Sequence, residues 1–287
     1  MSELICYKTL PVWHKETLPA AFQQQHNTRE GSWAQLTVLR GTLNFSLMTA
    51  AGEITETFTF TPDNQPPRIA PQQWHRIDSV SEDVECQLAF YCTAEQYYSQ
   101  KYQLTPPHSE VIEAAGKIPP GRVLDLGCGN GRNVLYLDQK GFSVEGWDKS
   151  TESLNQLQGI ITAEKRENIT LVQKDLNGVT LAGQYDFILS TVVMMFLQPD
   201  TIPALIKQMQ DATRPGGYNL IVAAMNTPDY PCPLPFPFTF RPGELLDNYT
   251  GWEIVKYNEN PGALHKVDAQ GNPIKLRFAT LLAKKKA

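Results

Sequence analysis

Cysteine is scarce in this chain, and no two cysteines stand in a C-x-x-C pair. Disulfide frameworks of secreted domains use an even number of cysteines, and thiolate zinc sites use closely spaced pairs. An odd count without such pairs argues against both and favours a reducing compartment. The five cysteines are Cys6, Cys86, Cys92, Cys128 and Cys232.

The chain also lacks an excess of positive charge. Its formal net charge is -5, and its single basic run is Lys284-Lys285-Lys286 at the C-terminus. Proteins that bind a phosphate backbone normally carry a basic face or stripe. Nucleic acid is therefore not an expected partner, and the terminal lysines are typical of a solvated tail.

No long hydrophobic run is present either. A membrane helix needs about 20 apolar residues, and no stretch approaches that length. The N-terminal segment carries charged side chains such as Glu3 and Lys8 and has no apolar signal-peptide region. We therefore expect a cytoplasmic protein without a membrane partner. Its 287 residues are enough for two domains.

The two halves of the chain differ in periodicity. From Trp33 to Cys92, short runs alternate apolar and polar residues and are separated by glycines and prolines, which predicts a small antiparallel sandwich or barrel. After Tyr98, helical segments alternate with short apolar runs, which predicts a mostly parallel sheet covered by helices. We expect a β-rich, cupin-like domain over residues 1–95 and an α/β domain over residues 96–287.

The C-terminal segments "GWEIVKYNEN" and "IKLRFATLLAKK" have strand character, and the polar segment "PGALHKVDAQGNP" between them reads as a turn. With no room for a helix, the two strands should pair as an antiparallel hairpin at the edge of the sheet.

The segment "GRVLDLGCGNGRN" (121–133) places a glycine-rich loop between a strand and a helix. A dinucleotide-binding fingerprint would have its third glycine at position 132, where this chain has Arg132. Asp125 lies inside the strand, and Asp148 closes the next strand, where a carboxylate can accept the ribose hydroxyls of an adenosine.

This combination resembles the class I S-adenosylmethionine-dependent methyltransferases, a Rossmann-like fold with a seven-stranded sheet. The resemblance implies that the loop Gly127 to Gly131 passes beneath the methionine part of S-adenosylmethionine, that Asp148 holds the ribose, and that Asp175 and Leu176 flank the adenine. Asp125 or Asp175 taken alone is also compatible with capping a turn. The expected cofactor residues are Asp125, Gly127, Cys128, Gly129, Asn130, Gly131, Arg132, Asn133, Asp148, Lys149, Asp175, Leu176, Asn177, Thr191 and Val192.

The fourth predicted strand, "YDFILSTVVMMF", lacks the Asn/Asp-Pro-Pro-aromatic element of base-amino methyltransferases, which favours a small substrate. Longer segments, including "CYKTLPVWHKETLP", "STVVMMFL", "GGYNLIVAAMNTPDYPCP" and "KLRFATLLA", resemble the tellurite-resistance methyltransferase family TehB in its form with a β-rich N-terminal domain. The family implies methyl transfer to tellurite, and also to selenite and related oxyanions.

A chalcogen lone pair carries no proton to remove, so alignment and desolvation can supply most of the catalysis, and the site should present donors to an oxyanion. Candidate catalytic residues are His265, Lys266, Arg277 and His108, with Arg132 as a further cation. Many relatives carry a second basic residue where this chain has Pro273, which leaves more of that role to Lys266 and Arg277. The segment "DYPCPLPFPFTF" (229–240) is either an aromatic lid or simple loop packing.

His26 and His75 in the N-terminal region are too few for a metal site, so no metal is expected. This region is expected to bind a small ligand, to dock on the catalytic domain or to aid formation of a homodimer, and the sequence does not choose among these. Two other functions stay open: a methyltransferase for a small organic thiol or acid, and a non-catalytic sensor that binds S-adenosylmethionine.

Overall fold

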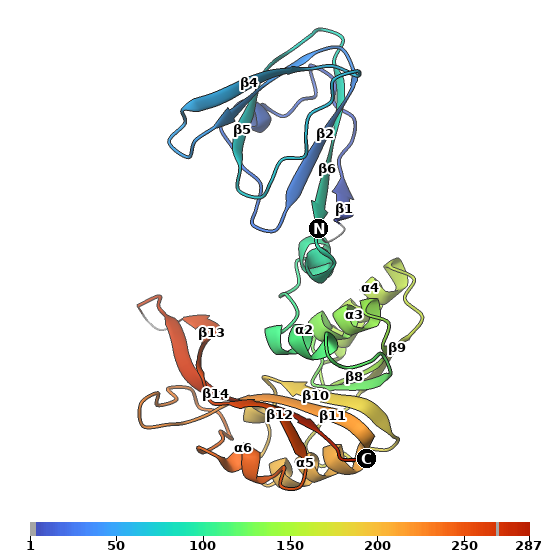
Figure 1. The fold of residues 1–287 in the computed structure, drawn as a ribbon, viewed down its shortest axis with the longest axis vertical. Helices are drawn as coiled ribbons and strands as arrows, with labels where there is room; N and C mark the ends of the chain where they lie inside the picture. Colours follow the sequence, from blue (N-terminus) through green and yellow to red (C-terminus); the bar gives the residue numbers. More distant parts are fainter. Residues whose placement is uncertain (1–3, 268–269) are drawn as a thin grey trace. The chain divides into compact units, whose positions relative to one another are not determined.

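The computed structural model describes residues 4–267 and 270–287 (Figure 1). The chain forms two compact units, of which the first ends at Pro106 and the second spans Pro107–Ala287. The limits 1–95 and 96–287 stay a prediction about domains, and the helical segment that follows residue 95 belongs to the first unit.

The first unit consists of two three-stranded antiparallel sheets, in the orders β1-β6-β2 and β4-β3-β5. Alternate residues of its strands face inward, for example Ala34, Leu36 and Val38 on β2, and build an apolar core between the sheets. A β-rich N-terminal region was expected and is confirmed, while its cupin-like character stays a prediction. Its elements are β1 (Ile5–Thr9), η1 (Ala20–Gln23), β2 (Trp33–Arg40), β3 (Leu43–Met48), β4 (Ile54–Phe60), β5 (Trp74–Val80), β6 (Glu85–Cys92), η2 (Ala94–Gln96) and α1 (Tyr97–Tyr102).

The second unit is built on a sheet in the order β12-β14-β11-β10-β7-β8-β9, with helices beside it (Figure 1). The strands from β9 to β11 are parallel, as predicted, and only β14 of this path runs against its neighbours. Its strands are β7 (Arg122–Leu126), β8 (Ser143–Asp148), β9 (Ile169–Gln173), β10 (Tyr185–Thr191), β11 (Thr213–Ala224), β12 (Glu253–Asn258), β13 (Pro261–Val267) and β14 (Pro273–Lys284). Its helices are α2 (Ser109–Ala115), α3 (Arg132–Gln139), α4 (Thr151–Ala163), η3 (Met194–Phe196), α5 (Thr201–Ala212) and α6 (Glu244–Asp247).

The order of the strands determines where a ligand can bind. From β7 the chain continues to β8 and β9 on one side, and then returns to β10 and β11 on the other side. Ligands of open α/β sheets bind at the carboxyl ends of the strands, where the order reverses. This point lies between β7 and β10 and brings Gly127 and Val192 to the same edge of the sheet.

The C-terminal hairpin is confirmed in its pairing and corrected in its connection. Strands β12 and β14 pair antiparallel, but the segment expected as a turn contains a further strand, β13, which pairs with the first half of β14 from Pro261↔Arg277 to Val267↔Pro273. Because β14 has 12 residues and β12 has 6, the early residues of β14 have backbone groups left for another partner. The sheet of described residues therefore has eight strands where seven were expected.

Among the described residues, no helix is both long and apolar enough to cross a membrane.

Candidate cofactor and substrate site

The glycine loop joins β7 to α3 at the place where the strand order reverses, between β7 and β10. Gly127 and Gly131 have φ angles of 79° and 87°, in the left-handed region that disfavours side chains. A Cβ at Gly127 would lie 2.5 Å from Cγ2 of Val193, and one at Gly131 would lie 2.3 Å from Cδ1 of Leu157. A Cβ at Gly129, in contrast, would meet no described atom within 4 Å. Two glycines thus allow close packing, and the middle one leaves open space for a ligand.

Asp148 fixes the loop to the end of β8. Its Oδ2 accepts a hydrogen bond from the backbone N–H of Gly129 at 2.8 Å, and its Oδ1 accepts from the N–H of Ser150 at 2.8 Å. Each carboxylate oxygen has a second lone pair. The carboxylate is therefore held in one orientation and can still accept hydrogen bonds from the two hydroxyls of a ribose.

A cleft of about 350 Å³ opens beside this loop. Six of the expected cofactor residues line it: Gly127, Asp148, Lys149, Asp175, Leu176 and Val192. Sequence reasoning missed four further lining residues, which are Lys174, Val193, Phe196 and Leu197. Lys174 directly follows β9, and its Nζ lies 3.8 Å from the centroid of the Trp147 ring. The sequence signal that could have identified Lys174 is its position directly after the third predicted strand of the parallel sheet.

The size and chemistry of the cleft fit an adenosine cofactor. Its volume lies in the ordinary range for small-molecule sites, which is about 300–1,000 Å³. It offers an oriented carboxylate at Asp148, apolar walls at Leu176 and Leu197, and open space over Gly129. These are the groups required for a ribose, an adenine ring and an adjacent chain.

Asp125 is buried beneath the loop and is only 1% exposed. Its Oδ2 has no hydrogen-bond partner among the described residues. Burial raises the pKa of this carboxyl to about 7, Arg132 counteracts the rise, and the charge of Asp148 adds to it. A buried carboxyl with an unpaired oxygen is costly unless it is protonated or bound. Asp125 is thus a buried carboxyl, two residues before Gly127, that lines neither the cleft nor the second cavity.

Several other expected residues are engaged in holding the loops together. Asn133 donates from Nδ2 to Oγ1 of Thr191 at 3.0 Å, and its Oδ1 accepts from the N–H of His108 at 3.0 Å. Asp175 caps a turn, because its Oδ1 accepts from the N–H of Asn177 at 2.9 Å. The Oδ1 of Asn177 in turn accepts from the N–H of Gln198. Thus Asp175 both lines the cleft and caps the turn.

Two expected loop residues differ in exposure. Cys128 is buried, and its Sγ would lie 3.0 Å from a Cβ built at Gly146, so it packs beneath β8. Burial raises the pKa of this thiol, so the group is a packed thiol rather than a thiolate. Asn130, at the tip of the loop, is exposed.

A second cavity of about 410 Å³ adjoins the cleft, and Val192 lines both. Val192 has a φ of 60°, which is a strained conformation for a β-branched residue. Its N–H donates to the carbonyl of Val222 at 2.7 Å. Such strained residues cluster at functional sites. The second cavity therefore lies where a substrate could meet the cofactor.

The second cavity contains charged side chains of both signs. Arg132 lines it from the first turn of α3, His108 and Glu110 from the start of α2, and Lys256 from β12. Lys256 Nζ donates to Oε2 of Glu110 at 2.7 Å and to Oε2 of Glu113 at 2.5 Å. Lys256 was not expected from the sequence, because only the sheet order brings β12 close to α2.

The four candidate catalytic residues have different surroundings. His108 lines the second cavity, and its Nδ1 accepts from the N–H of Glu110 at 3.2 Å. Arg277 lines neither cavity: its Nε and Nη2 donate to the carboxylate of Asp229, and its Nη1 donates to the carbonyl of Glu259. His265 and Lys266 lie within β13, but their side chains are outside the part of the chain that the structure describes.

The segment 229–240 packs against the mouth of the cleft. The ring of Phe236 lies edge-on to Phe196, a residue of the cleft, with centroids 5.3 Å apart. Cys232 is half-buried among apolar side chains, and its Sγ lies 3.6 Å from the carbonyl oxygen of Leu234. These contacts provide the packing that a lid would need.

Comparison with known proteins gives matches along almost the whole chain. Residues 90–282 match the family described as "Tellurite resistance protein TehB", and residues 8–88 match the "TehB-like domain". The chain is 51% identical over 286 residues to the "Probable S-adenosyl-L-methionine-dependent methyltransferase TehB" of Haemophilus influenzae, with 99% of each chain covered. The crystal structure of TehB from Haemophilus influenzae superimposes with a TM-score of 0.95 at 50% identity, over 99% of each chain. A protein named "Hemagglutinin 1" from Eikenella corrodens is 43% identical over 78% of this chain and 74% of its own length.

Proposed function

Because this chain belongs to the TehB family of S-adenosylmethionine-dependent methyltransferases, we propose that it methylates tellurite, and also selenite and related chalcogen oxyanions. The observation that carries the proposal is the second cavity, which shares Val192 with the cofactor cleft and contains Arg132 beside the paired charges of Lys256 and Glu110. The family description names tellurite resistance, which supports tellurite as the substrate. The guanidinium of Arg132 in this cavity is a group that binds oxyanions.

We propose that the cofactor lies in the 350 Å³ cleft. Asp148 would accept hydrogen bonds from the ribose hydroxyls, and Asp175 and Leu176 would flank the adenine. The backbone of Gly127 to Gly131 would support the methionine part. Asp125, whose Oδ2 has no partner among the described residues, would act on the site through its charge next to Arg132. When bound, S-adenosylmethionine supplies a methyl group on a sulfonium centre, which a chalcogen lone pair can attack.

Arg132 is our candidate for binding the oxyanion. It is half-buried and lines the second cavity, while the positive charge of Lys256 is already paired with Glu110 and Glu113. The neighbouring carboxyl of Asp125 has a pKa of about 7, so near neutral pH it offsets only part of the guanidinium charge. Arginine presents a planar fork of donors that matches an oxyanion. His108, with His265 and Lys266 from β13, would complete the donor set.

Methylation of tellurite needs no general base in this arrangement. The tellurium lone pair would form the new bond to the methyl carbon, and the bonding electrons of the broken sulfur–carbon bond would stay on sulfur. Tellurite gains a methyl group and loses one negative charge, without release of a proton. The residues of the site therefore need only align the substrate and exclude water, and the segment 229–240 would serve as the lid.

A turnover assay tests the proposal. Purified protein is incubated with S-adenosylmethionine, a thiol reductant and tellurite, and S-adenosylhomocysteine is quantified against a control without tellurite. Tellurite-dependent product is expected. Cofactor binding without product would contradict the proposal and favour the sensor, while product formed only with a small organic thiol or acid would favour that substrate class.

Two arginine variants examine the substrate site. Arg132→Gln should raise the KM for tellurite by roughly tenfold or more, the scale of a lost charged hydrogen bond. Arg241→Gln is the control, because Arg241 is an exposed arginine outside both cavities whose side chain pairs with Glu244. Equal KM values in the two variants would remove Arg132 from the substrate site.

A cytoplasmic location and a homodimer stay predictions.

A further inference from the structure

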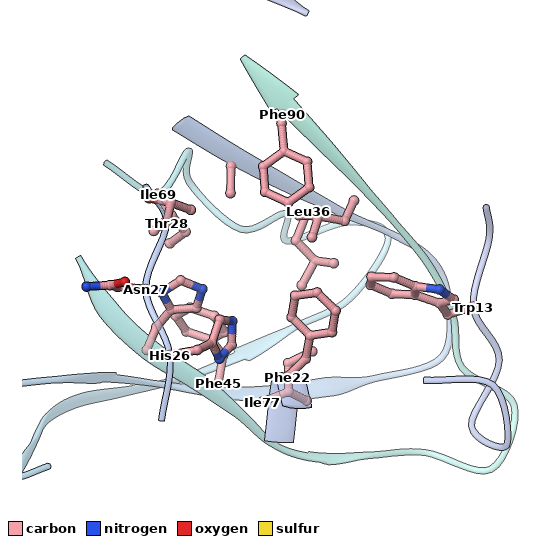
Figure 2. Close-up of a pocket in the computed structure, with 13 residues that line it drawn as sticks. Trp13, Phe22, His26, Asn27, Thr28, Leu36, Phe45, Ile69, Ile77 and Phe90 are labelled. Carbon is pink, nitrogen blue, oxygen red and sulfur yellow. The ribbon is translucent and has the colours of Figure 1, made fainter. Parts of the chain in front are cut away.

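A small cavity lies inside the first unit, between its two sheets. It has a volume of about 90 Å³ and is lined by strands of both sheets, including Leu36 on β2, Phe45 on β3 and Ile77 on β5. Figure 2 shows side chains such as Trp13, Phe22 and Phe90 arranged around this space, with His26 at its edge. The walls are therefore mostly apolar, and two histidines interrupt them.

The two histidines, His26 and His75, are held together by their own backbones. The N–H of His26 donates to the carbonyl of His75 at 3.0 Å, and the N–H of His75 donates to the carbonyl of His26 at 2.9 Å. Their ring centroids are 4.2 Å apart. The ring of His75 also stacks on Phe45, with centroids 5.3 Å apart. Both rings are thus fixed side by side in the cavity wall.

The hydrogen bonds of the rings determine where their protons lie. His26 Nδ1 is 2.8 Å from the carbonyl oxygen of Gln24, and His75 Nδ1 is 2.7 Å from that of Gln73. A carbonyl oxygen can only accept, so in both neutral rings Nδ1 carries the proton and Nε2 carries a lone pair. Burial lowers the pKa of both rings, that of His75 to about 4, so the neutral form prevails near neutral pH.

Neither Nε2 has a hydrogen-bond partner among the described residues, although His75 is only 6% exposed. Most polar side-chain atoms inside proteins are paired with a protein group or with ordered water, and these two nitrogens face the cavity that His26 and His75 line. A ligand that donates a hydrogen bond would pair with the Nε2 lone pair of one of these histidines.

The lining selects among the possible ligand classes. An anion would be repelled by the lone pairs, and an isolated cation would lose its hydration in an apolar cavity. A stable metal site uses three or four ligands, and among the described residues no group of three or more His, Cys, Asp or Glu side chains could hold a metal ion. A neutral molecule with an apolar body and a hydrogen-bond donor fits best.

We propose that the cavity lined by His26 and His75 binds a small neutral molecule that has an apolar body and one O–H, N–H or S–H donor. Its volume lies between that of a cavity for one water molecule and the roughly 150 Å³ of a cavity that holds benzene. The ligand therefore has only a few heavy atoms, as in a short alcohol or thiol. This site is independent of the methyltransferase activity proposed for the second unit.

A pair of isomers tests the donor directly on the unmodified full-length protein. 1-Butanol and diethyl ether have the same atoms, but only 1-butanol has an O–H donor. Each is titrated while the imidazole signals of His26 and His75 are followed by NMR. We expect saturable binding of 1-butanol about threefold to tenfold tighter than that of diethyl ether, the scale of one net hydrogen bond. The Nε2 signals should shift with 1-butanol only.

Variants assign the preference to the histidines. His75→Phe keeps an aromatic ring against Phe45 but removes the acceptor, and it should abolish the preference for 1-butanol while diethyl ether still binds. His26→Phe is the second variant if His75→Phe does not fold, and His14→Phe, at an exposed histidine outside the cavity, is the control. The proposal is overturned if neither isomer binds, if both bind equally, if the preference survives in both cavity variants, or if Zn²⁺ binds the histidine pair at submicromolar concentration.

Discussion

Each unit holds a buried titratable group, Asp125 in the second and His75 in the first, and the cavities of the two units differ in character. The cleft of the second unit is bordered by charged side chains and an open glycine loop, whereas the cavity of the first unit is small and mostly apolar. Asp125 Oδ2 in the second unit is a buried atom without a hydrogen-bond partner among the described residues. In the first unit, the described contacts of the His75 ring give a hydrogen bond to Nδ1 and none to Nε2. Of the two, only His75 lines a cavity that a ligand could fill, because Asp125 lines neither cavity of the second unit.

The same physical cause acts with opposite sign on these two groups. Burial disfavours the charged form of any group, so it raises the pKa of an acid and lowers the pKa of a base. Accordingly, the pKa of Asp125 is raised to about 7 and that of His75 is lowered to about 4. The two units should therefore respond to pH in opposite directions.

The largest effect is expected from Gly131→Ala, which would disrupt the second unit alone. The new methyl group would lie 2.3 Å from Cδ1 of Leu157 at a φ of 87°. Strain and overpacking together should lower the free energy of unfolding by roughly 2–6 kcal/mol. The measurement is denaturant unfolding, with hydrogen exchange by mass spectrometry to resolve the units.

Gly178→Ala is the matched control for this change. Gly178 has a φ of 78°, but a Cβ there would meet no described atom within 4 Å, so only about 1–3 kcal/mol of strain is expected. A similar loss in both variants would show that packing against Leu157 is unimportant. Faster exchange in residues 34–92 of Gly131→Ala would show that the units do not unfold separately.

Asp125 should make the second unit less stable as the pH rises. Its folded pKa of about 7 lies above the ordinary value of 3.8, so between these pH values the folded state binds more protons than the unfolded state. The free energy of unfolding then falls as pH increases from 4 to 7, by about 4 kcal/mol for this group. Asp125→Asn removes this dependence. The test is the difference between the wild-type and variant stability profiles of the cofactor-free protein, and a flat difference would contradict the raised pKa.

His75 should have the opposite effect in the first unit. Its folded pKa of about 4 lies below the ordinary value of 6.5, so between these pH values the unfolded state binds more protons. The free energy of unfolding therefore rises with pH across this window, and about 3 kcal/mol is lost as pH falls from 6.5 to 4. Hydrogen exchange in residues 34–92, compared between wild type and His75→Gln, measures the effect. If the stability difference between wild type and His75→Gln changed with pH in the same direction as that for Asp125→Asn, the lowered pKa of His75 would be contradicted.

The smallest effect is expected from Asp148→Ala, which should weaken binding of S-adenosylmethionine by roughly 1–3 kcal/mol. The variant loses the acceptor for the ribose and also the bonds to Gly129 and Ser150. Calorimetry measures the affinity, and Asp148→Asn, which keeps one acceptor oxygen, should lose less. An unchanged affinity in Asp148→Ala would remove this residue from the ribose site, and binding of 1-butanol in the first unit should be unaffected.

Much of the second unit was predictable because its signals are local. The strand, glycine loop and helix around residues 121–133 follow from side-chain periodicity and from φ angles that favour glycine. The pairing of β12 with β14 was also predicted correctly. Strand β13 was missed because its polar sequence resembles a turn, and it forms a strand only where the length of β14 provides a partner.

The sequence by itself determined the mostly parallel sheet, the glycine loop between β7 and α3, and the change from a β-rich region to an α/β region. Only the tertiary structure decided which distant residues meet. His26 and His75 became neighbours through a bridge between separate segments, and Lys256 reached Glu110 because of the order of the sheet. Val192 lines both cavities of the second unit. The physical reason is that periodicity and backbone preference are properties of neighbouring residues, whereas a binding site is formed by contacts between segments whose register is decided by packing.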